Sequence, residues 1–233
     1  MSVSTERKHS IKKKRTVFVI DDHPIVREGL TQLINREPDL SVCGVAEDTY
    51  AALRSMEVLK PDIAIADISL KGSDGIELIK NLKTRMPGLP VLVLSIHDES
   101  FYAPRALRAG ARGYIMKQEA TENVLVALRR VLSGEVYLSD RMANKMLQQF
   151  VGMVKTPQRF PVDRLSDREL EVFRLIGQGH GTRRIAEELH LSVKTVESYR
   201  EHIKEKMTLS DASELVQHAI EWVQREKSSN LLF

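Results

Sequence analysis

Short apolar runs alternate with amphipathic stretches through the first half of the chain. The runs are rich in β-branched residues, which is typical of strands buried on both faces, and we expect strands at 16–20, 40–45, 62–66, 90–94 and 113–116. Between them, apolar side chains recur at helical spacing, for example in 25–35, 76–82 and 124–132. Five strands, each followed by a helix, predict an α/β fold: a doubly wound, five-stranded parallel sheet with right-handed crossovers.

The second half shows no strand-like alternation. The segment Leu165–Leu170 predicts a helix start, because Ser166 can cap the backbone and Glu169 completes a capping box. We expect further helices at 182–189, 193–207 and 211–225, and a linker with a helix at 138–150 and a flexible stretch at 154–161. The chain thus divides into a basic tail (1–14), a first domain (15–136), a linker (137–161) and a smaller all-α domain (162–233).

Charge and composition narrow the function classes. The 233 residues carry a net charge of +3, but residues 1–15 hold six basic side chains and one acidic one, so the rest is slightly acidic. Net charge therefore gives no support for nucleic-acid binding, which needs a motif. The single cysteine, Cys43, excludes an intrachain disulfide and favours a reducing cytosol. No apolar run approaches the roughly 20 residues of a membrane helix, and no export signal is evident, so we expect a cytoplasmic protein without membrane contact.

Four predicted strands end on chemically distinctive side chains. Asp21 and Asp22 follow the first strand, Asp67 the third, Ser95 the fourth and Lys117 the fifth. The carboxyl ends of parallel strands share one edge, where ligands of open α/β sheets bind. Grouped carboxylates favour Mg²⁺, and an aspartate can attack phosphorus to form an acyl phosphate. Taken singly, Asp22 before Pro24 could cap a helix, Lys117 could be a surface lysine and Tyr114 a core residue.

The segments Val17–His23, Ala64–Ile68, Val91–Ser95 and Gly113–Lys117 resemble the signature set of bacterial response-regulator receiver domains over about residues 15–136. The resemblance implies a flavodoxin-like receiver with Asp67 as the phospho-acceptor. It implies Mg²⁺ ligation by Asp22, Asp67 and the backbone carbonyl of Ser69, with Asp21 acting through water. It also implies that Ser95 and Tyr114 form a switch pair and that Lys117 contacts the phosphoryl group. Ser69 and His97 would tune autodephosphorylation.

One position departs from the receiver pattern. Pro104 lies in Ser100–Ala109, where the fourth helix is expected. Proline is tolerated in a first turn but disrupts a helix interior. We therefore expect this helix either to start late, near Tyr102, or to be kinked.

The segment 179–196 has the pattern of a helix–turn–helix. Val196, Tyr199, Ile203 and Met207 then form one apolar stripe. Together with Leu165–Val172, the region resembles the LuxR-type DNA-binding domain of NarL/FixJ-type response regulators over about residues 162–226. It departs from that family at Thr208, where glycine is usual, and at Ala212, where arginine is usual.

In a helix–turn–helix, the second helix enters the major groove. The predicted DNA-binding residues are Arg183, Arg184, Lys194, Thr195, Glu197, Ser198, Arg200, Glu201, Lys204 and Lys206. Glu197 and Glu201 could accept from a cytosine amine or pair with Arg200 or Lys204. Because the domain is nearly neutral, nonspecific attraction to DNA should be weak. We therefore expect a homodimer on paired half-sites, formed through the last helix by Leu215, Ala219, Ile220 and Trp222.

These features predict a transcriptional response regulator. A sensor histidine kinase would phosphorylate Asp67 with Mg²⁺ and thereby control binding to double-stranded DNA. It would not be an enzyme beyond its own phosphorylation and dephosphorylation. One alternative, an aspartate-nucleophile phosphatase, usually has a second aspartate two residues after the nucleophile, where Ser69 stands. The other alternative is a receiver-controlled regulator whose helical module binds protein instead of DNA.

Overall fold

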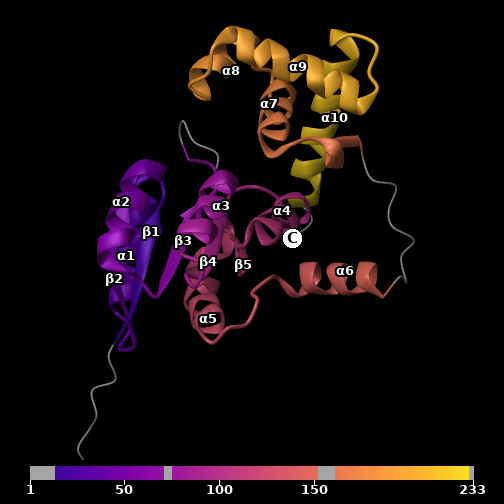
Figure 1. The fold of residues 1–233 in the computed structure, drawn as a ribbon. Helices are drawn as coiled ribbons and strands as arrows, with labels where there is room; N and C mark the ends of the chain where they lie inside the picture. Colours follow the sequence, from indigo (N-terminus) through magenta and orange to yellow (C-terminus); the bar gives the residue numbers. More distant parts are fainter. Residues whose placement is uncertain (1–13, 71–74, 152–160, 231–233) are drawn as a thin grey trace, which may run out of the picture.

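Five parallel strands form the centre of the first domain (Figure 1). The computed structural model describes residues 14–70, 75–151 and 161–230. The strands are β1 (Arg15–Ile20), β2 (Leu40–Ala46), β3 (Ile63–Asp67), β4 (Val91–Ser95) and β5 (Gly113–Met116). They are ordered β2-β1-β3-β4-β5, and every neighbouring pair is parallel. All five predicted strands and the doubly wound α/β class are confirmed.

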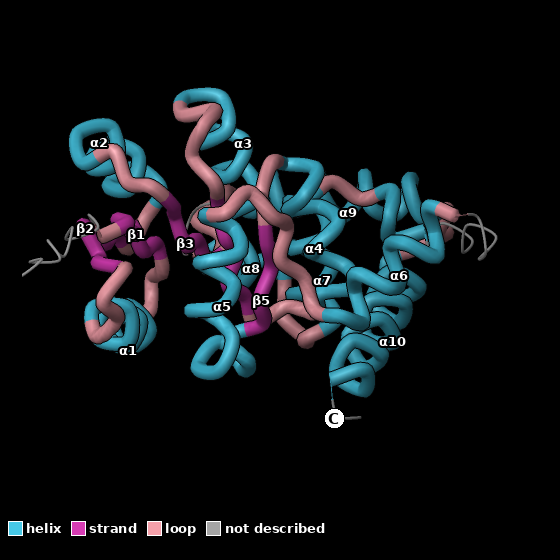
Figure 2. Tube along the Cα trace, turned by 90° about the horizontal axis from the view of Figure 1, so that it is seen from below, coloured by secondary structure: helices cyan, strands magenta, loops and turns pink. Residues whose placement is uncertain are grey.

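Helices cover both faces of this sheet (Figure 2). One face carries α1 (Pro24–Asn35) and α5 (Ala120–Leu132), which pack on Val19, Ile65 and Leu94. The other carries α2 (Thr49–Leu59), α3 (Gly75–Arg85) and α4 (Glu99–Ala109). Strands buried on both faces must be apolar throughout, which explains the continuous apolar runs of the sequence.

Two local expectations are corrected. The fourth helix begins at Glu99, capped by Asp98, and not near Tyr102. Pro104 therefore lies inside α4, where it costs one backbone hydrogen bond. The residue capping α1 is His23, without a side-chain cap, so the capping role considered for Asp22 is also wrong.

The second domain is helical throughout its described residues. After α6 (Asp140–Phe150) and a 3₁₀ turn, η2 (Pro161–Arg164), it contains α7 (Asp167–Gly177), α8 (Thr182–Glu188), α9 (Val193–Met207) and α10 (Ala212–Asn230). The predicted capping box is confirmed, with Ser166 and Glu169 each bonding the other's backbone N–H. The predicted tail and the stretch 154–161 lie outside the described residues, apart from Lys14 and Pro161.

Two backbone positions shape this helical domain. At Gly177, an added Cβ would lie 2.2 Å from the carbonyl oxygen of Ala219, so glycine permits the close packing of α7 on α10. Thr208, after α9, has a φ of 60°, in the left-handed region that disfavours a β-branched residue. Among the described residues, no helix has the length and apolarity required to cross a membrane.

Candidate phosphoryl site and DNA-binding surface

The strand ends bring the predicted acidic residues together. The order of the sheet reverses between β1 and β3, and the crevice beyond such a point is where ligands bind in this architecture. Asp21 follows β1, and Asp67 is the last residue of β3; both are 1% exposed. Lys117 begins η1 (Lys117–Glu119), directly after β5. Three segments that are distant in sequence thus supply one polar cluster.

Lys117 connects two of the carboxylates. Its Nζ lies 2.7 Å from Asp67 Oδ2 and 2.7 Å from Asp21 Oδ2. Burial disfavours the ammonium, but the charges of Asp67 and Asp21 outweigh it and hold the pKa of Lys117 above its ordinary value. Lys117 is therefore a fixed cation beside the predicted phospho-acceptor.

Asp67 is placed by its own loop as well as by Lys117. Its Oδ1 accepts a 2.8 Å hydrogen bond from the backbone N–H of Ser69. Burial raises the pKa of Asp67, whereas Lys117 and the Ser69 N–H act against that rise. The carboxylate is thus held at the strand end, in contact with a cation.

Asp22 and His23 complete the cluster. The Nδ1 atom of His23 lies 2.7 Å from Asp22 Oδ1 and 3.0 Å from Asp21 Oδ1. Asp21, Asp22, His23 and Asp67 each place one potential metal-ligand atom within 4.8 Å of the others. The three carboxylates are the hard oxygen donors that suit Mg²⁺. His23 is not among the ligands predicted from the sequence.

A second group of side chains connects the site to the start of α4. The Oγ atom of Ser69 lies 2.9 Å from His97 Nε2. The His97 N–H donates to Ser95 Oγ at 3.0 Å, and the Tyr114 hydroxyl donates to the His97 carbonyl at 2.9 Å. The structure therefore brings Ser69, Ser95, His97 and Tyr114 together.

His97 is the centre of this group. It is buried, and desolvation, with smaller effects of Arg174 and Lys117, lowers its pKa to about 3. Its ring is therefore neutral near pH 7. It stacks on Tyr102 of α4, with ring centroids 4.5 Å apart. The sequence contained no signal for this stacking, because it depends on how α4 packs.

The helix–turn–helix is formed by α8 and α9. Ile185 and Val196 are completely buried between the helices. Arg183, Arg184, Lys194, Glu197 and Ser198 are exposed, and Thr195 is partly exposed beside the capping residue Ser192. The exposed residues thus lie at the start of α8 and at the start of α9, the predicted recognition helix.

Several of the other predicted DNA contacts are engaged within the domain. Lys206 Nζ lies 2.6 Å from Glu169 Oε2 and Lys204 Nζ lies 2.9 Å from Glu201 Oε2. Glu201 is thus paired with Lys204, which is one of the two roles that the sequence suggested for it. For Glu197 we find no ion pair among the described residues. Arg200 is partly buried beside α10.

The prediction that four residues of α10 form the dimer contact is wrong for three of them. Leu215 and Ala219 are 0% exposed and Trp222 is 9% exposed, because they pack inward on α7. Ile220 is 37% exposed and lines a groove of about 560 Å³ with Val216 and Arg200. Of the four predicted residues, Ile220 offers the accessible surface.

Comparisons with known proteins agree with this geometry. Residues 17–129 match the response regulator receiver domain, and residues 163–219 match the luxR family of bacterial regulatory proteins. The chain is 34% identical over 209 residues to the oxygen regulatory protein NreC of Staphylococcus epidermidis, covering 88% of this chain and 96% of the relative. It is 35% identical over 210 residues to NreC of Staphylococcus haemolyticus, with the same coverage.

A solved structure shows the same two-domain arrangement of folds. RcsB from Salmonella enterica serovar Typhimurium, bound to the promoter rprA in the presence of the phosphomimetic BeF₃⁻, matches with a TM-score of 0.61 and 26% identity. The match covers 88% of this chain and 98% of RcsB. The chain therefore belongs to the two-component response regulators of the NarL/FixJ type, in which a receiver domain precedes a LuxR-type DNA-binding domain.

Proposed function

We propose that Asp67 accepts a phosphoryl group from a sensor histidine kinase and that this modification controls binding of the second domain to DNA. The observation that carries the proposal is the contact of Asp67 with Lys117, 2.7 Å long, at the switch point of the sheet. A buried carboxylate beside a fixed cation can act as a nucleophile and have its product charge stabilised.

The transfer is a simple displacement. A carboxylate oxygen of Asp67 forms a bond to phosphorus while the phosphorus–nitrogen bond of a phosphohistidine breaks. The bonding pair leaves with the imidazole nitrogen, and an acyl phosphate remains on Asp67. Lys117 lies where its ammonium can neutralise a phosphoryl oxygen, and Ser95 lies at the end of the adjacent strand. Hydrolysis with water would restore the carboxylate and release inorganic phosphate.

The residues around Asp67 fit a hard divalent cation. Asp22 and Asp67 supply carboxylate oxygens, the Ser69 carbonyl would supply another, and Asp21 would act through water, as in the family pattern. Asp21 and Asp67 are both buried, so their charges need a compensating cation. When bound, Mg²⁺ would neutralise charge on the phosphoryl oxygens.

The DNA-binding step rests on α9. Its N-terminal residues are exposed, and this end of a recognition helix reaches base edges. Arg183, Arg184 and Lys194 would contact phosphates, which position the helix without specifying sequence. Two copies on paired half-sites would add the affinity that the nearly neutral domain lacks, with Ile220 in the contact between copies.

Labelling with acetyl phosphate and Mg²⁺ tests the acceptor. The wild-type chain should gain one phosphoryl group by intact-mass analysis, and Asp67→Asn should gain none. Asp140→Asn, which changes an exposed aspartate of α6, is the matched control and should be labelled like wild type. Labelling of Asp67→Asn at the wild-type rate would overturn the assignment.

Selection from a random duplex library tests the DNA-binding step. The phosphorylated chain should enrich a sequence with two half-sites, and its binding should weaken as salt rises. Failure to enrich any sequence would instead favour a protein-binding module. The exposed acidic side chains Glu197 and Glu205 of α9 would then be the first surface to examine.

A further inference from the structure

A groove of about 1240 Å³ follows the edge of the receiver sheet opposite the phosphoryl site. Residues at the amino ends of four strands line it, which are Arg15 for β1, Asp62 for β3, Val91 for β4 and Arg112 for β5. These strands are neighbours in the sheet, so three strand spacings give the groove a length of roughly 14 Å. In Figure 1 this edge is the lower end of the sheet, away from α7–α10.

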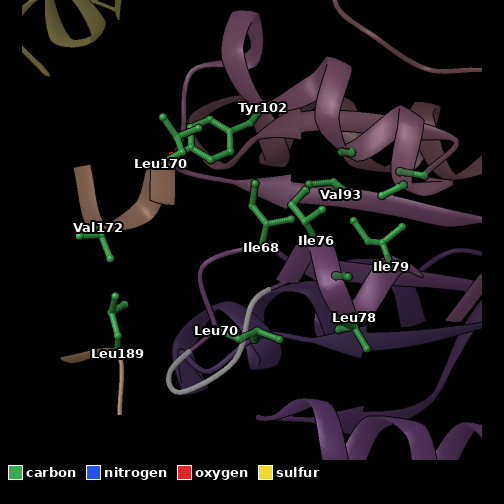
Figure 3. Close-up of a cluster of buried hydrophobic side chains, with 14 of the residues drawn as sticks. Ile68, Leu70, Ile76, Leu78, Ile79, Val93, Tyr102, Leu170, Val172 and Leu189 are labelled. Carbon is green, nitrogen blue, oxygen red and sulfur yellow. The ribbon is translucent and has the colours of Figure 1, made fainter. Parts of the chain in front are cut away.

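Apolar side chains form most of the lining. Leu89 before β4, Leu138 of the linker and Met146 of α6 are only partly buried. Another part of the wall is Ile79 of α3, which is completely buried and lies in the same group of side chains as Val93 (Figure 3). The groove thus presents apolar surface that is continuous with the core. A ligand with an apolar body would remove part of this surface from water.

The walls of the groove are held in place without a ligand. Pro87 and Pro90 fix two φ angles in the loop between α3 and β4. On the opposite side, the Tyr137 N–H donates to the Arg112 carbonyl at 3.0 Å, and the Tyr114 N–H donates to the Tyr137 carbonyl at 2.9 Å. These bonds attach the linker to β5. A ligand would therefore order few additional groups when it binds.

The charged residues of the lining leave an excess of positive charge. Five are basic and two are acidic. Glu57 is paired with Arg85 at 3.3 Å and Asp62 is paired with Arg15 at 3.2 Å, so both acids are already neutralised. The three remaining basic residues of the lining form no ion pair with any residue that the structure describes, and they are Lys60, Lys83 and Arg112. The charge of the groove is therefore complementary to an anion.

Two of these cations lie at one corner of the groove. Gly110 has a φ of 120°, and a Cβ added there would lie 2.5 Å from Lys83 Cδ, so the Lys83 side chain lies directly against the backbone after α4. Arg112 follows two residues later, and its N–H donates to the Val91 carbonyl at 2.8 Å. The dipole of α3 favours a cation at Lys83, in the last turn of that helix, but Arg112 precedes a strand and has no such partner.

We propose that this groove binds a long-chain fatty acid, with the carboxylate at Lys83 and Arg112 and the alkyl chain along Leu138 and Met146. A narrow apolar groove with a cationic corner suits an alkyl chain that has one anionic end. None of the described lining residues is aromatic, so a nucleotide base would find no stacking partner there. Because Met146 belongs to α6, the ligand would contact the receiver and the linker helix together.

Titration of the full-length chain with laurate, below its micelle concentration, tests the site. Dodecanol and dodecylamine carry the same alkyl chain with a neutral and a cationic end. Lys83→Gln and Arg112→Gln each remove one charge, whereas Met146→Gln removes an apolar contact. Arg108→Gln, which changes an exposed cation of α4 outside the lining, is the matched control. Calorimetry measures affinity, and thermal unfolding without ligand shows whether each variant is folded.

We expect one laurate per chain and a higher unfolding temperature in its presence. Lys83→Gln and Arg112→Gln should each weaken laurate binding about tenfold, as for the loss of one charged hydrogen bond. Dodecanol should bind more weakly than laurate and equally to wild type and to both of these variants. Met146→Gln should weaken both ligands, and Arg108→Gln should weaken neither. Dodecylamine should not displace laurate.

Three results would overturn the fatty-acid site. The first is no saturable binding of laurate. The second is equal laurate affinity in wild type, Lys83→Gln and Arg112→Gln. The third is equal binding of laurate and dodecylamine, which would indicate adsorption of alkyl chains without recognition of charge. Asp67→Asn should bind laurate like wild type, so a failure of the proposed phosphorylation would leave this outcome unchanged.

Discussion

The Nζ atom of Lys117 lies 2.7 Å from Oδ2 of Asp67, which makes the proposed nucleophile one half of a buried ion pair. The same ammonium is equally close to Asp21, so one positive charge faces two carboxylates. This imbalance explains why the pocket suits a divalent cation. A further positive charge near Asp21 and Asp22 would offset the excess of negative charge.

Lys117→Gln should weaken the receiver and make it more dependent on Mg²⁺. Removal of the cation leaves Asp21 and Asp67 uncompensated. We expect a loss of about 2 kcal/mol without divalent ions, less than for a completely buried pair because 13% of the Lys117 side chain is exposed. Mg²⁺ should raise the unfolding temperature more in the variant than in wild type. Labelling by acetyl phosphate should slow by about 100-fold.

Thermal unfolding in EDTA and in Mg²⁺ checks the first part of this prediction. Arg36→Gln, an exposed cation after α1, is the control and should show the wild-type response. An identical Mg²⁺ shift in Lys117→Gln and wild type would mean that the lysine and the metal ion do not compensate the same charges.

Thr208→Gly should stabilise the DNA-binding domain. Thr208 ends α9 with a φ of 60°, a conformation that costs a residue with a Cβ about 1–2 kcal/mol. Glycine avoids this strain but loses more conformational freedom on folding, about 0.5–1 kcal/mol. The expected gain is therefore about 1 kcal/mol, measured by urea unfolding of the full chain. Ser210→Gly, without a positive φ in the wild type, should give no gain.

The architecture of the first domain could be predicted from the sequence because buried parallel strands give continuous apolar runs, as in Val91–Leu94. It also indicated Asp67 and Lys117, since each follows such a strand and topology alone brings them to one edge. Contacts between elements could not be predicted in this way. Leu215 and Ala219 have the spacing of a dimer stripe, but they form the intramolecular contact with α7.

The contact between Arg105 of α4 and Asp167 of α7 could not be predicted from the sequence either. The two residues are 62 positions apart, and although Asp167 lies within the Leu165–Val172 segment, nothing in that segment marks it as a partner of Arg105. Pro104, which the sequence marks as a point of disruption, lies inside a continuous α4. The packing of α4 against Leu170 and Trp222 favours the helix there, and such tertiary support has no local signature.

Acid should destabilise the DNA-binding domain through Glu169. Burial opposes ionisation of this residue, but hydrogen bonds from Lys206 and from Ser166 outweigh it and hold the pKa of Glu169 below its ordinary value. An acid whose pKa is lower in the folded state contributes stability above its unfolded pKa, near 4.3, and loses it as the pH falls through the folded pKa.

Glu169→Gln tests this contribution. At pH 7 the variant should unfold at a lower temperature than wild type, and the difference should shrink as the pH falls below about 4. Glu205→Gln, an exposed glutamate of α9, is the control and should differ little from wild type at either pH. A difference for Glu169→Gln that stays constant from pH 7 to pH 3 would contradict an electrostatic role.

Glu197→Ala should reduce the preference for a particular DNA sequence and raise the affinity for unrelated duplexes. Glu197 is exposed near the start of α9, and its charge would repel phosphates unless it accepts a hydrogen bond from a base amine. The wild type should therefore prefer cytosine at one position of each half-site, worth about 1–3 kcal/mol. The variant should lose this preference and bind unrelated duplexes more tightly.

Library selection with wild type, Glu197→Ala and Glu205→Ala measures both effects, and only the first variant should change the selected base. A gain in general affinity with the same selected sequence would show that Glu197 is a solvent-facing charge, and that specificity arises from other side chains of α9.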